Sequence, residues 1–520
     1  MAGKDAFVEL VKQGYSFKGE HFRIGTAIIG GEILTGTNVL LPLRTMNRHG
    51  LIAGATGTGK TKTLQVIAEG LSNASVPVLL MDIKGDLSGI AAAGTENDKI
   101  KERIFRMGGT YTPTSYPVEL LTLSDQQGVR LRATVTEFGP ILISKILGLN
   151  TTQEGVVAMI FKYCDDNGMP LLDLKDFIKV LQYVGNEGKS LIEKDYGKIS
   201  TSTTGTILRK VIELQQQGAD VFFGEPSFEI DDLMRIGDDG RGIISILRVT
   251  DMQSKPKLFS TFMLSLLAEL YATLPEEGDL EKPKFIMIID EAHLVFQEAT
   301  DALLQQIETV IKLIRSKGVG IFFCTQNPQD IPASVLSQLG LKVQHALRAF
   351  TAADRKTIKQ AAENYPETEF YDVDELLTQL GIGEAFVTML NEKGIPTPLV
   401  HTMLVPPQSR MDVLTESEIV SLVNKSKLAK KYQETDDTES AYEILNAKLE
   451  EAAARSEERI EEKKSIGKRP EKSTMEKVLD SSVTRQIGRT AANVITRSLL
   501  GALGLGGRST TRKRKNSSWF

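Results

Sequence analysis

The hydrophobic positions of the chain fall into short, nearly continuous runs rather than alternating ones. Runs of this kind, rich in Val, Ile, Leu, Phe and Met, are typical of strands in a parallel sheet covered on both faces. Helix-type patterns separate several of them, and this alternation predicts a doubly wound α/β core. The expected strands are 50–54, 76–82, 242–249, 285–290 and 319–325, with later runs at 342–347 and 384–390, and the expected helices are 62–72, 255–274 and 302–317.

Residues 91–241 have a different character, because their apolar positions recur mostly at helical spacing. We therefore expect a helical subdomain inserted into the core. Ahead of the core, residues 1–45 form a short β-rich lead-in with apolar runs at 22–28 and 38–43. The chain thus divides into a lead-in (1–45), a core (46–407) that carries the insertion, and a tail (408–520). The helices expected in the insertion are 141–147, 153–164, 174–184 and 204–217.

The tail is helical and charged in its first half and basic at its end. Residues 440–464 are dense in Glu, Ala, Lys and Arg and predict a solvated helix, with a linker at 465–473. From residue 485 onward the tail contains Arg and Lys but no Asp or Glu. Its apolar, Gly-rich segment 494–507 fits a pore plug, a DNA-binding tail, a membrane-surface helix, or a disordered or oligomer-stabilising tail.

Composition narrows the class of protein only slightly. A hydrophobic content of 41% and a charged content of 25% are ordinary for a globular protein, and the net charge of -5 hides the basic tail. Two distant cysteines, Cys164 and Cys324, cannot build a disulfide framework or a cysteine-rich metal site, which favours a reducing compartment. The start is not a signal peptide, and no run approaches the roughly 20 apolar residues of a membrane span. We expect a cytoplasmic protein without an integral membrane segment.

A phosphate-binding motif follows the first core strand. Residues 54–61, GATGTGKT, match G-x-x-x-x-G-K-[ST] between a strand-like GLIAG and a helical pattern. Such a loop directs backbone N–H groups and a helix N-terminus at phosphate oxygens. Lys60 would reach the β- and γ-phosphates, and the Thr61 hydroxyl would bind Mg²⁺. The predicted nucleotide-binding residues are Gly54, Ala55, Thr56, Gly57, Thr58, Gly59, Lys60, Thr61 and Thr63.

A second motif supplies the carboxylates that such a site needs. The apolar run 285–289 ends in Asp290 and Glu291, so Asp290 is expected to help hold Mg²⁺ and Glu291 to orient or deprotonate the attacking water. The two motifs together predict ATP hydrolysis. The letters DEAH at 290–293 invite comparison with superfamily-2 helicases, but 230 residues separate Lys60 from Asp290 and the other helicase motifs are missing.

Two further strand ends carry polar residues. Gln326 follows the strand after Asp290, where it would contact the γ-phosphate or the attacking water, or lie in a surface loop. Asp82 ends the second core strand and either lies near the nucleotide or terminates the strand in a turn.

These motifs resemble those of the HerA–FtsK class of hexameric P-loop ATPases, which have a RecA/FtsK-like core, and most closely the YjgR-like branch of HerA-type helicases and translocases. The resemblance spans about residues 30–405. It departs from the family ahead of residue 50, where HerA-type proteins usually have a β-barrel domain about twice as long. The segments that carry the resemblance are 47–61, 79–89, 285–293, 315–332 and 345–356.

The resemblance implies ATP hydrolysis at the subunit interfaces of a homo-hexameric ring that moves double-stranded DNA through its pore. It implies a finger role in the neighbouring subunit's site for Arg48 and a sensor role for Arg315, because a guanidinium offers fixed donors to developing phosphoryl charge. Each could instead be an ordinary surface or ion-paired arginine. A nuclease or another protein is a possible partner. The alternative function is a regulatory or assembly ATPase that acts on a protein partner without moving DNA; a conjugation-type coupling ATPase is a third.

Overall fold

A single sheet of twelve strands organises the computed structural model, which describes residues 2–251, 255–278, 280–296, 301–349, 351–432, 438–451 and 454. The strand order is β2-β1-β12-β11-β10-β3-β9-β8-β4-β7-β5-β6. The strands are β1 His21–Ile29, β2 Glu32–Pro42, β3 Gly50–Ala53, β4 Val78–Asp82, β5 Val118–Thr122, β6 Val129–Arg130, β7 Ile244–Arg248, β8 Phe285–Ile289, β9 Val319–Thr325, β10 Leu341–Gln344, β11 Glu384–Thr388 and β12 Val400–Leu404.

Eight of these strands, from β10 to β6 in the sheet order, pair in parallel, and the remaining four pair antiparallel. All five expected core strands form, and β10 and β11 extend the sheet as the two later runs predicted. The parallel half is covered on both faces because consecutive side chains of a strand point to opposite sides. In β4, Leu79 and Met81 join one core cluster while Val78 and Leu80 join the other.

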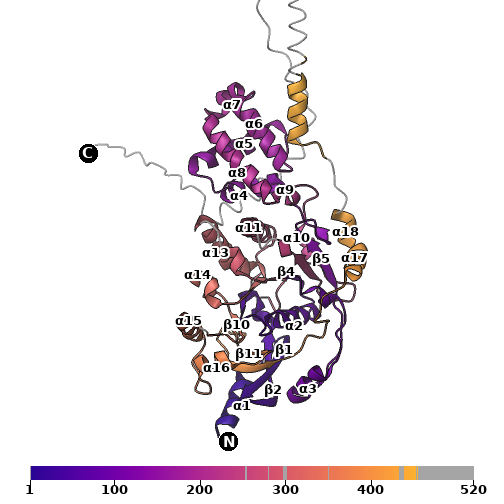
Figure 1. Cartoon of the computed structure of the whole chain (residues 1–520), viewed down its shortest axis with the longest axis vertical. Coiled ribbons are helices and arrows are strands. Elements are labelled where there is room, and N and C mark those ends of the chain that lie inside the picture. Colours follow the sequence, from indigo (N-terminus) through magenta and orange to yellow (C-terminus); the bar gives the residue numbers. More distant parts are fainter. Residues whose placement is uncertain are drawn as a thin grey trace, which may run out of the picture.

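Helices cover the sheet and extend above it (Figure 1). The helix α2 follows the phosphate-binding motif, and α11 and α13 form the helices expected before and after β8. Up to residue 432, the helices with eight or more residues are α1 Ala2–Gly14, α2 Lys60–Asn73, α3 Asp98–Met107, α4 Val135–Ile146, α5 Thr151–Asn167, α6 Leu174–Gly185, α7 Lys189–Tyr196, α8 Thr201–Gln216, α11 Pro256–Thr273, α13 Asp301–Ile314, α15 Ala352–Ala362 and α17 Glu416–Lys425. Shorter ones are α9 Ala219–Phe222, α10 Ile230–Leu233, α12 His293–Phe296, α14 Ala333–Leu336, α16 Val373–Gln379 and α18 Lys427–Tyr432.

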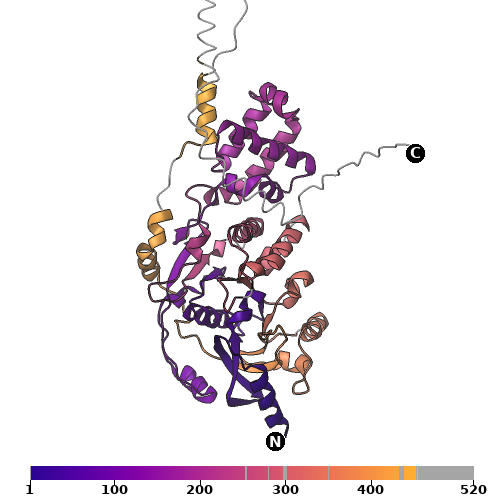
Figure 2. The ribbon, with the colours of Figure 1, turned by 180° about the vertical axis from the view of Figure 1, so that it is seen from behind.

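The helical subdomain lies at one end of the molecule, where α4 to α9 pack together (Figures 1 and 2). It begins later than the expected boundary at residue 91. Residues 118–130 contribute β5 and β6 to the main sheet, and α3 lies beside β2 at the other end of the molecule. The reason is that β5 pairs in parallel with β7 over its whole length, so this part of the expected insertion belongs to the core sheet.

The N-terminal lead-in is also part of the sheet, and it opens with a helix, α1, where only strands were expected. The helix α1 buries Phe7 and Val11, and the hairpin β1–β2 pairs through β1 with β12. After β12, the chain passes along the edge of the sheet, where α17 packs on β5 and α18 on β6.

A helical segment, residues 441–451, then lies beside the helical subdomain (Figure 1). It is the described part of the helix expected at 440–464; the linker at 465–473 and the basic end of the tail lie outside the described residues. Within the parts of the chain that are described, no helix is both long and apolar enough to cross a membrane.

Candidate active site

The phosphate-binding loop connects β3 to α2 and adopts backbone conformations that favour glycine. Gly54, Gly57 and Gly59 have positive φ angles of 151°, 79° and 111°, and Gly59 caps the start of α2. The first N–H groups of a helix have no partner within the helix, so the start of α2 offers donors and a positive dipole end to an anion. The conformation of the loop suits phosphate, and the contact of its residues with a nucleotide stays a prediction.

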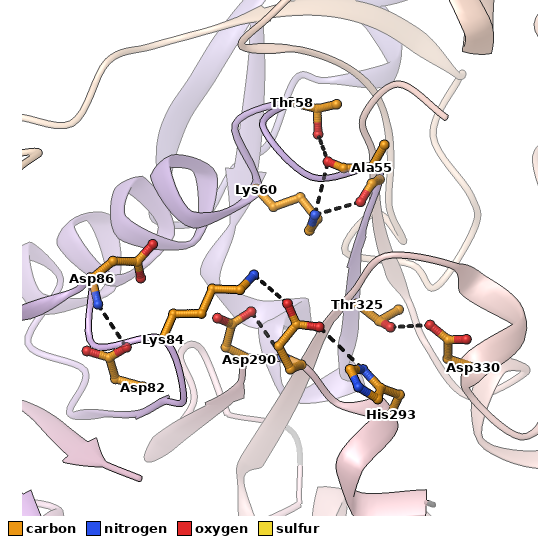
Figure 3. A network of polar contacts seen from close by, with 12 residues as sticks. Ala55, Thr58, Lys60, Asp82, Lys84, Asp86, Asp290, His293, Thr325 and Asp330 are labelled. Carbon is orange, nitrogen blue, oxygen red and sulfur yellow. Dashed lines mark hydrogen bonds and ion pairs between the residues drawn. The ribbon is translucent and has the colours of Figure 1, made fainter. Parts of the chain in front are cut away.

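Lys60 points back into the loop. Its Nζ donates to the carbonyl oxygens of Gly54 and Ala55 at 2.6 and 3.1 Å, and the residue is only 6% exposed (Figure 3). The Thr58 hydroxyl donates to the same Ala55 oxygen at 2.7 Å. Burial lowers the pKa of Lys60. The ammonium therefore stands inside the loop, where it can exchange carbonyl partners for phosphate oxygens.

Thr63 lies one turn into α2. Its Oγ1 is 2.9 Å from Nε2 of His345, which directly follows β10. Burial lowers the pKa of His345 to about 3, so the ring is neutral. Thr63 thus connects α2 to His345, which lies next to the phosphate-binding loop. The contact of Thr63 with a nucleotide remains a prediction.

Asp290 follows β8 and is 1% exposed. Its Oδ1 accepts a hydrogen bond from the backbone N–H of Glu291 at 3.0 Å, while Oδ2 has no hydrogen-bond partner among the described residues. Burial raises the pKa of Asp290 even though the nearby Lys84 ammonium opposes the shift. An unpartnered buried carboxylate oxygen is costly, so its presence beside a phosphate-binding loop points to a bound partner.

The residues present fit Mg²⁺. A carboxylate oxygen from Asp290 and a hydroxyl from Thr61 are the hard oxygen ligands this ion prefers, and the ion commonly keeps waters and phosphate oxygens as its other ligands. Among the described residues, no group of three or more His, Cys, Asp or Glu side chains is arranged to hold a metal ion.

Glu291 lies next to Asp290 in a left-handed backbone conformation with a φ of 46°, which is uncommon for a residue with a side chain. Its Oε1 pairs with the Lys84 ammonium, and its Oε2 lies 3.3 Å from Nδ1 of His293 (Figure 3). The side chain is 8% exposed. The two predicted carboxylates thus lie together with Lys84, for which the sequence predicted no role.

Asp82 terminates β4 in a turn, which is one of the two roles expected for it. Its Oδ1 accepts from the N–H groups of Gly85 and Asp86 at 2.6 and 3.2 Å, and its Oδ2 accepts from Leu87 at 3.2 Å. Burial raises its pKa to about 6. Its oxygens are therefore occupied by the backbone of the turn that carries Lys84.

The strand β9 runs between β3 and β8, which places its end between the phosphate-binding loop and Asp290. Gln326 directly follows this strand and is exposed. The preceding Thr325 is buried, and its hydroxyl donates to Asp330 at 2.6 Å. Gln326 thus lies at the edge of the sheet that the sequence predicted, and its contact with nucleotide or water remains a prediction.

Arg48 and Arg315 lie at the opposite edge of the sheet. Arg48 precedes β3, and Arg315 follows α13 and precedes β9, so both stand at the amino ends of their strands. Between them His49 is buried: its Nε2 donates to the Ile311 carbonyl at 2.9 Å, and its Nδ1 accepts from the Ile321 N–H at 3.0 Å. Burial lowers the pKa of His49 to about 4. The neutral imidazole of His49 therefore links the segment that carries Arg48 to the helix that precedes Arg315.

Comparison with known proteins identifies the relatives of this chain. It is 24% identical over 387 residues to the DNA double-strand break repair helicase HerA of Saccharolobus solfataricus, covering 74% of this chain and 69% of the relative. The protein of the same description from Sulfolobus acidocaldarius is 20% identical over 367 residues, with 70% and 67% covered.

Among solved structures, the plasmid coupling protein TrwB in complex with ADP and Mg²⁺ matches 78% of this chain and 100% of its own, at 15% identity and a TM-score of 0.49.

The model of the Helicase HerA-like C-terminal family matches residues 31–510, nearly the whole chain. This match covers the phosphate-binding loop, the strand that precedes Asp290 and the strand that precedes Gln326. The chain is accordingly a P-loop ATPase of the HerA–FtsK class, and it belongs to the Helicase HerA-like C-terminal family.

Proposed function

We propose that the protein is an ATP-driven motor that works as a homo-hexamer and translocates double-stranded DNA as a HerA-type helicase. The observation that carries the proposal is the position of Arg48 and Arg315 at the amino edge of the sheet, with Lys60, Asp290 and Glu291 at the carboxyl edge. A strand of four residues such as β3 spans about 13 Å, so neither arginine is placed to reach the nucleotide of its own chain. A neighbouring subunit's nucleotide is the partner this arrangement suits.

Within one site the residues divide the work. The loop 54–61 and the start of α2 bind the phosphates, and Lys60 neutralises their charge. Thr61 and Asp290 would hold Mg²⁺, which supplies charge neutralisation at the phosphate oxygens. Glu291 accepts a hydrogen bond from the attacking water and so orients it, and Gln326 would contact the same water or the γ-phosphate. Arg48 from the next subunit stabilises the developing phosphoryl charge.

The relatives support the nucleic-acid part of the proposal, since two of them are named as DNA double-strand break repair helicases. The two cysteines are free and buried, which suits the reducing cytoplasm in which we place the motor. A nuclease or another protein is the partner we would look for in addition to DNA.

Mixing two inactive variants tests whether each ATP site is completed by an arginine of the neighbouring subunit. In a ring of Arg48→Ala and Lys60→Ala subunits, an intact loop from the first can face an intact arginine from the second, so we expect ATPase activity that neither variant shows alone. Arg44→Ala is a matched control, because Arg44 lies on the same 3-10 helix and pairs with Glu281 at 3.7 Å. Absence of recovered activity across all mixing ratios would contradict a finger that acts between subunits.

A second measurement addresses the substrate. We expect the ATPase rate to rise when double-stranded DNA is added at low salt and to fall back as salt screens the phosphate contacts. A rate that does not respond to DNA at any salt concentration, in rings that do form, would favour the regulatory or assembly ATPase instead.

A further inference from the structure

The turn after β4 places a lysine in the active site. Asp82 closes this turn by accepting three backbone hydrogen bonds, and Gly85 adopts a φ of 76° within it. Because β4 and β8 are parallel neighbours, in register from Val78 with Ile286 to Met81 with Ile289, the turn lies beside the residues that follow β8. Lys84 is therefore held over Asp290 and Glu291 by backbone geometry.

The Lys84 ammonium pairs with Glu291 on one side and faces the phosphate-binding loop on the other (Figure 3). It is near enough to Lys60 for its charge to lower the pKa of that lysine, and near enough to Asp290 to oppose the rise in the pKa of that carboxyl. Its side chain is 34% exposed, whereas Glu291 is 8% exposed. Lys84 is thus the more exposed partner, and its ammonium lies between Glu291 and the phosphate-binding loop (Figure 3).

This ion pair also restricts the Glu291 side chain. The Lys84 ammonium forms an ion pair with Oε1, and Nδ1 of His293 lies near Oε2. The backbone of Glu291 keeps a left-handed conformation that costs about 1 kcal/mol or more. Oε1 is directed at the Lys84 ammonium, so loss of that partner would free this oxygen for a water molecule. A triphosphate carries more negative charge than Glu291 and competes with it for the same ammonium.

We propose that Lys84 is a positioning residue that exchanges partners between Glu291 and the γ-phosphate. Without nucleotide it holds Glu291 in the resting arrangement described above. When ATP binds, its ammonium turns to the γ-phosphate and Glu291 is released to the attacking water. ADP has no γ-phosphate, so it leaves the pair intact. The proposal rests on the ATP site of the proposed function, but not on DNA or on translocation.

A double-mutant cycle on nucleotide affinity tests the exchange, with a non-hydrolysable ATP analogue and ADP as the two probes. Glu291→Gln removes the competitor, so we expect it to tighten binding of the analogue by about tenfold and to leave ADP affinity unchanged. Lys84→Met should weaken binding of the analogue by about tenfold, again without affecting ADP. In the double variant, the Glu291→Gln substitution should no longer change the affinity for the analogue.

Two controls separate the exchange from a general effect of charge. Lys84→Arg keeps the cation and should retain most of the preference for the analogue over ADP. Lys99→Met removes a positive charge from the exposed face of α3 and should change neither affinity. Thermal unfolding of each variant shows whether it is folded, and a variant that does not fold is replaced by Lys84→Gln.

The proposal is overturned if Glu291→Gln changes the affinities for the analogue and for ADP equally, or if its effect persists in the Lys84→Met background. A different result bears on the ATP site itself: if the unmodified protein binds neither probe, or Lys60→Ala binds both as tightly, the nucleotide site of the proposed function fails, whatever Lys84 does.

Discussion

Thr63 and His345 join the helix after the phosphate-binding loop to the residue after β10, through a contact of 2.9 Å between Oγ1 and Nε2. Both side chains are buried, and the His345 Cβ lies 2.5 Å from the position that a Cβ on Gly54 would occupy. His345 therefore packs directly against Gly54 and forms the floor of the phosphate-binding loop. This contact leaves no room for a side chain on Gly54.

This floor predicts a difference between two glycine substitutions. Gly54→Ala places a methyl group against His345 in addition to its unfavourable φ, whereas a Cβ on Gly57 meets nothing within 4 Å. Since overpacking costs about 1–3 kcal/mol, we expect Gly54→Ala to lower the free energy of unfolding by that much more than Gly57→Ala. Chemical denaturation without nucleotide measures it, and equal stabilities for the two variants would show that the floor is not rigid.

The two motifs predict separable defects in binding and turnover. Lys60→Ala removes the ammonium that is held inside the loop, so tight ATP binding should be lost. Glu291→Gln keeps the shape of the side chain and should retain ATP binding while turnover falls by about 10²–10⁴-fold. Nucleotide titration and steady-state ATPase assays distinguish the two, and normal hydrolysis by Glu291→Gln would remove that residue from its role.

The buried His49 predicts an acid-sensitive fold. Its pKa is lowered from 6.5 to about 4, mainly by burial and to a smaller extent by the charge of Arg315. As the pH falls, the unfolded chain therefore binds a proton at this residue before the folded chain does. The contribution of neutral His49 to the free energy of unfolding is complete above pH 6.5 and declines as the pH falls toward 4. Between pH 7 and 5 the free energy of unfolding should fall by about 2 kcal/mol from this residue alone.

Denaturation curves of His49→Gln at the two pH values check this prediction, because the variant should lose that part of the pH dependence. His21→Gln, at the exposed end of β1, is the matched control. If both variants keep the full pH dependence, His49 is not its source.

The chain after β12 packs against α2, and this contact gives another prediction. Glu69 accepts hydrogen bonds from the N–H groups of Gln408 and Ser409 at 2.9 and 3.0 Å and from the Ser409 hydroxyl at 2.5 Å. Glu69→Ala leaves these donors without an acceptor, at a cost of about 1–3 kcal/mol for each buried group that stays unsatisfied. We expect faster amide hydrogen exchange at Gln408 and Ser409. Glu102→Ala, on the exposed face of α3, should leave those exchange rates as they are.

The sequence predicted the central strands well because they are buried on both faces and therefore read as continuous apolar runs. The strand β5 was missed because Glu119 interrupts its run. The structure shows why a charge is tolerated there: Glu119 pairs with Arg235 at 3.1 Å and accepts a hydrogen bond from Ser426. Neither partner is near Glu119 in the sequence, so the local pattern gave no sign of this strand.

The active site shows the same contrast between residues that a local motif predicts and residues whose role depends on the fold. Lys60, Asp290 and Glu291 belong to motifs whose spacing is tied to a strand end, so their meeting at one edge of the sheet was predictable. The role of Lys84 was not, because it depends on β4 being the neighbour of β8 and on a turn closed by Asp82. The floor formed by His345 likewise requires β10 beside β3.

The pairing of β1 with β12 has a consequence for how the protein is made. The register joins Gly25 to Leu404, so the first hairpin must wait for the residues that complete its side of the sheet. At synthesis rates of about 5–20 residues per second, the ribosome needs roughly 20 to 75 seconds to deliver them. Throughout that interval the newly made β1 presents an unpaired edge, and the cell has to keep that edge away from other nascent chains.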